Sequence, residues 1–448
     1  MAFWLLVATA VRLEAQTTPS PITVPVRTLS ISMDDAVTMA RVRSFRVQRG
    51  LRDDKIANLR LATARAQTGP RFDLSANASQ AESYYSSRSE LFRSHSTDSA
   101  FLMDLQASAS MPIDIAGVQR RQVQQARLSR AISELELAQT YIDVTAEVRS
   151  VYVGALRAQE QVSADEAVVT RIDALITRIG EDKADSKAYL QTERSNATQV
   201  LESSRTDAEI VQGDLKQALR LPPETRLILT SRLNDPQSLP KTREILQTAY
   251  AHRTDIKQSK LRLEQARLSE KQIADDRKPS LDVTAFANQS IGGPLFRQPY
   301  RNRFRSVSAI LSLTIPLLQY DGGALGNNRR VSQLEMEQAE ADIEERREGV
   351  ETEIRQALIA LTRAQARLGT LPDVGQALAA LEHAESAMLA ASPGQASALL
   401  AQVTNARASW RSAVTSSIDA QTDYYLALYR LQRSMGGEGN FNDPDIAR

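Results

Sequence analysis

The sequence predicts a mainly helical fold with a small β part, built from two copies of one structural unit. Three observations support this prediction. The chain matches itself when shifted by 209 positions, four runs of about ten residues alternate apolar and polar side chains, and two long segments carry apolar residues at alternating steps of three and four. A period of two is typical of β-strands, whereas a mean step of 3.5 residues is typical of helices packed as coiled coils.

The internal match divides the chain into a first unit at 29–223 and a second unit at 224–437, followed by a polar tail at 438–448. Each unit predicts the order helix, strand, loop, strand, long helix, break and long helix. Between the two strands of a unit the shift falls to 204, which a five-residue difference in loop length explains. The aligned positions include Pro70 with Pro279, and Met103–Pro112 with Val307–Pro316.

Residues 1–28 are predicted to be a leader with a secretory signal peptide. Their apolar run, Phe3–Val11, is too short to span a bilayer as a helix. Its length suits the apolar region of a signal peptide, although no basic residue precedes it. The segment therefore favours export of the chain.

Composition and charge exclude several classes of function. The 55 basic and 54 acidic residues leave a net charge of +1, so nothing indicates a nucleic-acid-binding protein. The chain has no cysteine, which excludes disulfides, cysteine-ligated metal centres and thiol nucleophiles. Its three histidines lie far apart in the sequence and do not predict a metal site. No cofactor is expected.

The four alternating runs lie at about 71–80, 102–112, 280–290 and 304–316. In the first run, Phe72 and Leu74 alternate with Asp73 and Ser75. A length of about ten residues suits a tilted strand that crosses a bilayer in a barrel. Four strands cannot close a barrel, since known transmembrane barrels have at least about eight, and open strand edges cannot face lipid. Two, three or four chains that share one barrel would meet both requirements.

Long helical hairpins are predicted at about 118–221 and 324–435. Their tips are expected at the breaks near Gly180–Ser186 and Ser392–Gly394. The repeat that predicts them comprises Val144, Val148, Val151, Ala155, Ala158 and Val162 in the first unit, and Val350, Ile354, Ala357, Leu361, Ala364 and Leu368 in the second.

A distinctive corner joins each strand pair to the long helix that follows. The second corner reads Pro316-Leu317-Leu318-Gln319-Tyr320-Asp321-Gly322-Gly323, and its weaker counterpart reads Pro112-Ile113-Asp114-Ile115-Ala116-Gly117. Proline ends strand pairing because it lacks an N–H group. In the second corner Asp321 can cap the helix that follows, and Gly322 and Gly323 allow the backbone to turn from strand to helix.

These corners, together with Pro70 and Pro279 before the first strand of each unit and with the duplication itself, resemble the outer-membrane efflux protein family, the TolC-like channels. The resemblance covers 29–437. It implies a homotrimer whose chains complete one twelve-stranded barrel in the lipid of the outer membrane, with a helical tunnel below it in the periplasm. It also implies docking to a periplasmic adaptor (membrane fusion) protein and to an inner-membrane pump of the RND, ABC or MFS type, for efflux or type I secretion.

No grouping of residues predicts catalysis, so the chain is not expected to be an enzyme. The resemblance places a gate at the hairpin tips, where Asp182, Lys183, Asp185 and Gln395 are the candidates. Acidic rings set the selectivity of cation pores, which favours Asp182 and Asp185 as a constriction. The same tips could instead bind the adaptor. The alternative function is a soluble or surface-attached coiled-coil structural protein. The transported substrate is not predicted.

Overall fold

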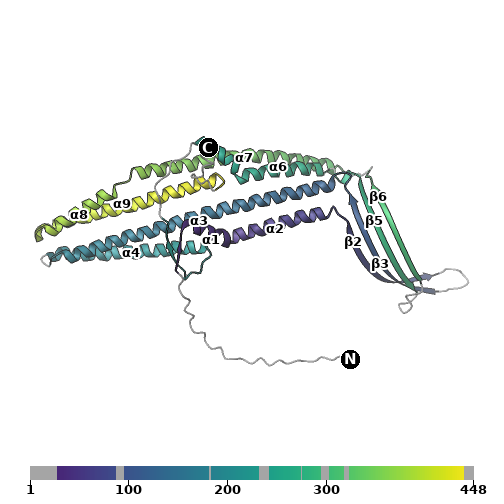
Figure 1. The fold of residues 1–448 in the computed structure, drawn as a ribbon, viewed down its shortest axis with the longest axis horizontal. Coiled ribbons are helices and arrows are strands. Elements are labelled where there is room, and N and C mark those ends of the chain that lie inside the picture. Colours follow the sequence, from purple (N-terminus) through teal and green to yellow (C-terminus); the bar gives the residue numbers. More distant parts are fainter. Residues whose placement is uncertain are drawn as a thin grey trace, which may run out of the picture.

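The structure of the chain is a computed structural model that describes residues 28–86, 95–180, 183–231, 242–273, 275–293, 302–316 and 322–437. Figure 1 shows an elongated array of helices that continues at one end into a tilted sheet. Within the described residues, no helix has both the length and the apolar character that crossing a membrane requires.

The sheet confirms the prediction of four strands, and these strands pair antiparallel. Its strands are β2 (Arg71–Ser86), β3 (His95–Ile113), β5 (Ser280–Gly293) and β6 (Asn302–Thr314). They lie in the order β2-β3-β5-β6, so the two units meet where β3 pairs with β5. β2, β3 and β5 are longer than their alternating runs, because pairing continues through polar residues such as Tyr84 opposite Thr97. Backbone hydrogen bonds do not need apolar side chains, so the sequence pattern underestimates these strands.

The helical hairpin of the first unit consists of α3 (Val118–Arg178) and α4 (Ala184–Ala218). The second unit contains α7 (Ala324–Gly369), α8 (Val374–Ala390) and α9 (Pro393–Ser434). One continuous helix was predicted where α7 and α8 lie, and this prediction was wrong. Pro372 cannot continue a helix, and the side chain of Asp373 caps α8 by accepting a hydrogen bond of 2.8 Å from Gly375 N.

Shorter elements precede the strands of each unit. They are α1 (Met33–Arg43), α2 (Phe45–Ala66), α5 (Thr242–His252), α6 (Thr254–Gln272) and the 3-10 turn η2 (Asp275–Arg277). The sequence did not predict β1 (Thr28–Ile31) and β4 (Arg226–Leu229), which form a parallel pair. Four residues are too few to display a period of two above chance.

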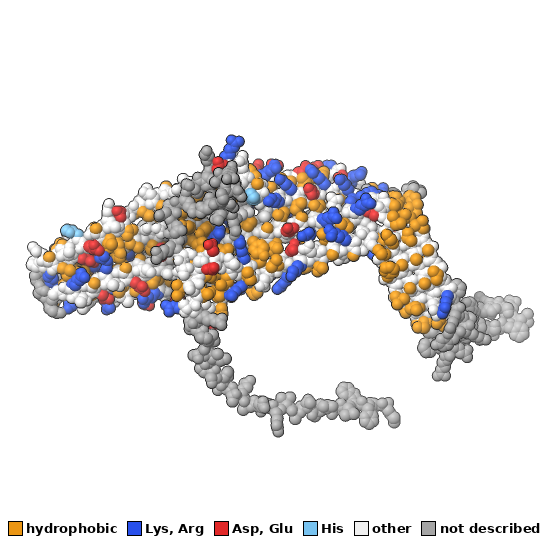
Figure 2. Space-filling model, in the orientation of Figure 1, with side chains coloured by type: hydrophobic (Ala, Val, Ile, Leu, Met, Phe, Trp, Pro, Cys, Tyr) orange, Lys and Arg blue, Asp and Glu red, His pale blue; other side chains and the backbone are white. Residues whose placement is uncertain are grey.

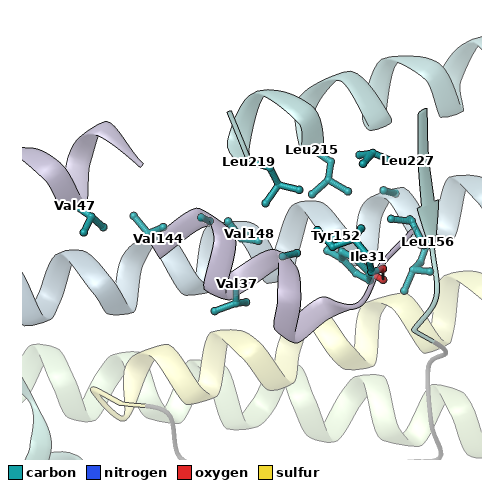
Figure 3. Packing of buried hydrophobic residues seen from close by; sticks show 14 residues of the cluster. Ile31, Val37, Val47, Val144, Val148, Tyr152, Leu156, Leu215, Leu219 and Leu227 are labelled. Atoms are coloured by element: carbon teal, nitrogen blue, oxygen red, sulfur yellow. Dashed lines mark hydrogen bonds between the residues drawn. The ribbon is translucent and has the colours of Figure 1, made fainter. Parts of the chain in front are cut away.

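The 3.5-residue repeat marks the buried seam of each unit. In the first unit Val144, Val148 and Ala155 are buried, and in the second their counterparts Val350, Ile354 and Leu361 are buried. Around the first seam, the core joins α1, α3 and α4 to the β1–β4 pair (Figure 3).

Tyr152 of α3 connects this helix to the β1–β4 pair through hydrogen bonds. It is fully buried, and its hydroxyl donates to Ile31 O at 2.9 Å and accepts from Ser231 N at 3.3 Å. We expect Tyr152→Phe to lower the free energy of unfolding by about 1 kcal/mol, because Ser231 N loses its partner while Ile31 O keeps a second donor, Thr230 N. Thermal unfolding in detergent would measure the loss, with Tyr189→Phe at an exposed site as the matched control. Equal melting temperatures for the two variants would contradict this role.

Candidate functional site

The sheet is strongly apolar on its surface. Phe72 on β2 is 77% exposed and Val307 on β6 is 85% exposed, although both are large apolar side chains. Figure 2 shows hydrophobic side chains gathered over the sheet, whereas charged side chains are spread over the helices. In addition, β2 and β6 each have a hydrogen-bonded neighbour on one side within the described chain. The surface is therefore suited to lipid, and the two edges are suited to further strands.

The first corner turns the chain from β3 into α3. Gly117 has φ +72°, a left-handed conformation that favours glycine, and it directly precedes α3. Pro112 lies one residue before the end of β3 and beyond the part of β3 that pairs with β2. Asp114 accepts hydrogen bonds from Gln119 N at 3.3 Å and Arg120 N at 3.0 Å, so it caps the helix. The first corner thus combines a proline near the end of the strand, a capping aspartate and a glycine at positive φ.

An ion-paired cluster joins this corner to the second unit. Arg121 of α3 donates to Asp275 through Nε at 2.9 Å and Nη2 at 2.5 Å, and Lys278 Nζ donates to the same carboxylate at 2.6 Å. Burial opposes ionisation of Asp275, but the hydrogen bonds from Arg121 and Lys278 outweigh it, so the pKa lies below its usual value. Asp275 and Lys278 line an open hollow of about 870 Å³ at the base of the sheet. It fixes the two units to each other where strands give way to helices.

The second corner is described in part. Gly322 and Gly323 have φ values of +61° and +90°, and Gly323 directly precedes α7. Pro316 follows the end of β6, while Pro70 and Pro279 each directly precede a strand. Asp321 lies outside the described residues, so its predicted capping role remains a prediction.

The structure places Lys183 at the hairpin tip. Lys183 lies in the turn before α4 and is buried, and its Nζ donates to Leu389 O at 2.8 Å and to Met388 O at 3.3 Å. These are among the last carbonyls of α8, where a cation is favourable. Lys183 therefore connects the tip of the first hairpin to the second.

The other tip candidates are placed separately. Asp185 is exposed in the first turn of α4. Gln395 is exposed in the first turn of α9, where its side chain contacts Ser392 Oγ at 3.1 Å. Asp182 lies outside the described residues. The structure thus brings Lys183 to the second hairpin and leaves Asp185 and Gln395 facing outward.

A charge cluster around the buried Arg407 lies behind the tip and joins four helices. It consists of Arg171 (α3), Glu193 (α4), Glu385 (α8) and Arg407 (α9). The Arg407 side chain is 4% exposed and lies 2.9 Å from Glu193, while Arg171 lies 3.3 Å from Glu385. Burial raises the pKa of Glu385 above its usual value, although Arg171 and Arg407 oppose the rise. This charge cluster holds the two hairpins together.

Further polar contacts follow the boundary between α3 and α9 away from the tip. Asp165 is buried on α3, accepts from Ser204 Oγ at 2.7 Å and pairs with Arg411 at 2.9 Å. Beyond it come Arg157 with Asp419 at 2.7 Å and Asp143 with Arg433 at 2.8 Å. The two hairpins are therefore joined by ion pairs along much of their length. Movement of one hairpin relative to the other would break these pairs.

Sequence reasoning missed the charge cluster and Asp165. Arg171 and Glu385 are 214 residues apart, so no local spacing connects them. One sequence feature could have indicated these contacts. Arg407 and Arg411 lie four residues apart within the apolar repeat of α9, where a buried arginine requires a partner. Among the residues that the structure describes, no group of three or more His, Asp or Glu side chains could hold a metal ion.

Comparisons with known proteins agree on one family. The model of the outer membrane efflux protein family matches residues 39–220 and 245–437, one match for each unit. Comparison with curated protein sequences yields no significant match.

Solved outer-membrane channels share the fold. The MtrE channel of Neisseria gonorrhoeae, in its open state, is 17% identical, with a TM-score of 0.71 over 90% of this chain and 89% of that one. The CmeC channel of Campylobacter jejuni is 16% identical, with a TM-score of 0.66 over 93% of this chain and 89% of that one. The outer membrane protein VceC of Vibrio cholerae is 17% identical, with a TM-score of 0.64 over 90% of this chain and 96% of that one. The chain belongs to the outer membrane efflux protein family, and it is a TolC-like efflux channel of the outer membrane rather than an enzyme.

Proposed function

We propose that three copies of this chain form a passive export duct that crosses the outer membrane. The observation that carries the proposal is the four-stranded apolar sheet with open edges at β2 and β6. Such edges are unfavourable in lipid because their backbone groups lack partners, so other copies must supply the missing strands. Three copies would give twelve strands, above the minimum of about eight for a closed barrel.

The helical part then lies in the periplasm and continues the duct. We propose that its tip engages a periplasmic adaptor protein and an inner-membrane pump of the RND, ABC or MFS type, in efflux or type I secretion. The energy for transport would come from the pump, and the duct would need no cofactor. The length and ion-paired surface of the helices support a role as a conduit across an aqueous compartment.

The four tip candidates divide into two roles in this proposal. Lys183 holds the hairpin tips together through the α8 carbonyls and favours the closed state. Asp185 and Gln395 face the aqueous space at the end of the duct, and Asp182 remains a candidate from the sequence alone. Three copies of Asp185 would form an acidic ring that attracts cations.

We expect Asp185→Asn to reduce the preference for cations over anions in planar-bilayer recordings, because it removes one negative charge per copy from the constriction. The reversal potential in a KCl gradient measures this preference. Asp207→Asn on the same helix is a matched control, since it removes an equal charge farther from the tip. An unchanged reversal potential in Asp185→Asn would remove this residue from the constriction.

The same recordings test the duct itself. Purified protein from the outer-membrane fraction should produce discrete conductance steps. A protein that remains soluble without detergent and produces no steps would instead fit the alternative of a coiled-coil structural protein, and the proposed duct would be wrong.

A further inference from the structure

The apolar face of the sheet contains an open hollow of about 390 Å³. Phe72 of β2 lies on one side of it and Val307 of β6 lies on the other. The floor between them is formed by four alanines of the two central strands, namely Ala107, Ala109, Ala285 and Ala287. The hollow therefore lies within the sheet of one chain, and its volume falls in the range of roughly 300–1,000 Å³ that is typical of ligand sites.

The strand register explains why the surface is hollowed here. Ala107 lies opposite Ala287, and Ala109 lies opposite Ala285, so small side chains meet small ones across β3 and β5. Larger side chains occupy the same face on both sides along the strands. Leu105 lies opposite Gln289 toward the far end of the sheet, and Met111 lies opposite Val283 toward the helices. The hollow is thus bounded along the strands as well as across them.

A basic side chain stands at the end of the hollow that is farther from the helices. Arg305 precedes Val307 by two residues on β6 and lies opposite Gln289, so it shares the apolar face. It is exposed, and it forms no hydrogen bond or ion pair within the described part of the chain. Among the side chains that the structure describes on this face, Arg305 is the charged one. A charge beside lipid requires a counter-ion.

The position of Arg305 along β6 gives its level in the membrane. β6 runs from the far end of the sheet toward the helices, and Arg305 precedes its last residue, Thr314, by nine residues (Figure 1). At about 3.3 Å per residue and a strand tilt of about 40°, this separation is about 23 Å along the membrane normal. The apolar band of such barrels is about 25 Å tall. Because the helices lie in the periplasm, Arg305 lies at the level of the headgroups of the outer leaflet.

We propose that this hollow, together with Arg305 and Gln289, binds one molecule of lipopolysaccharide per copy. Lipopolysaccharide is the phosphorylated glycolipid of the outer leaflet. One acyl chain fills the hollow over the alanines. The guanidinium of Arg305 pairs with a phosphate, whose oxygens match its fork of N–H donors. This inference rests on the proposed duct, because it requires the sheet to lie in the outer membrane.

The two parts of the site act together on one amphiphile. An empty hollow would leave its apolar lining without contacts, so an ordered acyl chain gains dispersion energy there. The ion pair lies at the edge of a medium of low dielectric constant, which strengthens it relative to an ion pair in water. The amide of Gln289 offers a donor and an acceptor, which suit the hydroxyl and amide groups of a sugar headgroup. A lipid held in this way should remain bound through extraction with a mild detergent.

Native mass spectrometry of protein extracted from the outer membrane tests the phosphate contact. The unmodified protein should retain lipopolysaccharide at up to one molecule per copy, and Arg305→Gln should reduce the retained amount about ten-fold. Arg71→Gln is the matched control. Arg71 is also exposed and without an ion pair among the described residues, but it lies opposite Ser110 on the polar face of the sheet. This control should retain as much lipopolysaccharide as the unmodified protein.

A second variant tests the hollow without changing any charge. Ala107→Leu places a large side chain where the acyl chain is expected and should reduce retention several-fold. Its matched control is Ala78→Leu, since Ala78 is exposed on the same face, opposite Met103 and outside the hollow. Equal retention in these two variants would show that the hollow does not hold the acyl chain and would overturn the proposed site.

The outcomes separate this inference from the duct. Variants with the mass of three copies and the conductance steps of the unmodified protein are correctly assembled, so their lipid content reports on the site. An assembled, conducting protein that retains glycerophospholipid in place of lipopolysaccharide, or that retains equal amounts of lipopolysaccharide with and without Arg305, would overturn the site and leave the duct intact. A protein that stays soluble without detergent would overturn both.

Discussion

Arg407→Met should destabilise the tip of the helical hairpins by about 3 kcal/mol, because it removes the buried arginine that compensates two mostly buried carboxylates. Glu193 and Glu385 would remain largely buried, and Glu193 would lose its 2.9 Å ion pair with Arg407. Methionine has a similar volume, so loss of packing is a minor part of this effect.

The expected functional result is a channel that opens more often. If the cluster contributes only to the closed state, about 3 kcal/mol corresponds to roughly a hundred-fold shift toward the open state. The open probability in planar-bilayer recordings measures this shift. Arg194→Met is the matched control, since Arg194 pairs with Asp173 across α3 and α4 at an exposed site, where such pairs contribute about 0–1 kcal/mol.

A second substitution distinguishes the effect of an unpaired charge from the effect of a changed side-chain shape. Glu193→Met added to Arg407→Met removes both partners and should restore much of the closed state, since apolar replacement of a buried ion pair is often neutral. An Arg407→Met channel with the open probability of the unmodified protein would mean that the charge cluster does not restrain opening.

Gly436→Ala is expected to lower the free energy of unfolding by about 3 kcal/mol. Gly436 follows α9 with φ +78°, and a Cβ built on it would lie 2.8 Å from Arg253 Cα. The left-handed conformation alone costs about 1–2 kcal/mol for a residue with a Cβ, and overpacking against backbone adds about 1–3 kcal/mol.

The region matters because Arg253 connects three elements. Its guanidinium donates to Ser434 O at 2.9 Å and pairs with Asp255 at 2.7 Å and Glu353 at 2.6 Å. Displacing the Arg253 backbone would therefore disturb α6, α7 and α9 together.

Thermal unfolding in detergent measures the Gly436→Ala effect, and the neighbouring Gly437→Ala is its control. A Cβ at Gly437 meets nothing within 4 Å, and its φ does not lie in the left-handed range. We expect the control to change stability by less than about 0.5 kcal/mol. Similar melting temperatures for both variants would show that α9 ends without a close contact to Arg253.

The sequence allowed prediction of those parts of the fold that repeat over many residues. Strands such as β5 and helices such as α3 bury one face, so apolar residues recur at the period of the backbone. The glycines of both corners were also predictable, since a turn from strand to helix leaves few alternatives to glycine at positive φ.

Other parts depend on contacts between distant segments. The β1–β4 pair joins segments from both units and is too short to show alternation. The charge cluster requires knowing that α3, α4, α8 and α9 meet, which the apolar repeat does not specify. For the tips, the sequence identified the position of Lys183 but not its burial against the carbonyls of α8.

The most direct test of the account is the mass of the protein complex in detergent. The chain would be produced with a complete export signal in a bacterium with two membranes, extracted from the outer membrane, and measured by light scattering with the detergent contribution removed. Closure of one barrel by three copies predicts a protein mass three times the 49.4 kDa of the chain. A protein mass of one chain would leave β2 and β6 without partners and would contradict the shared barrel.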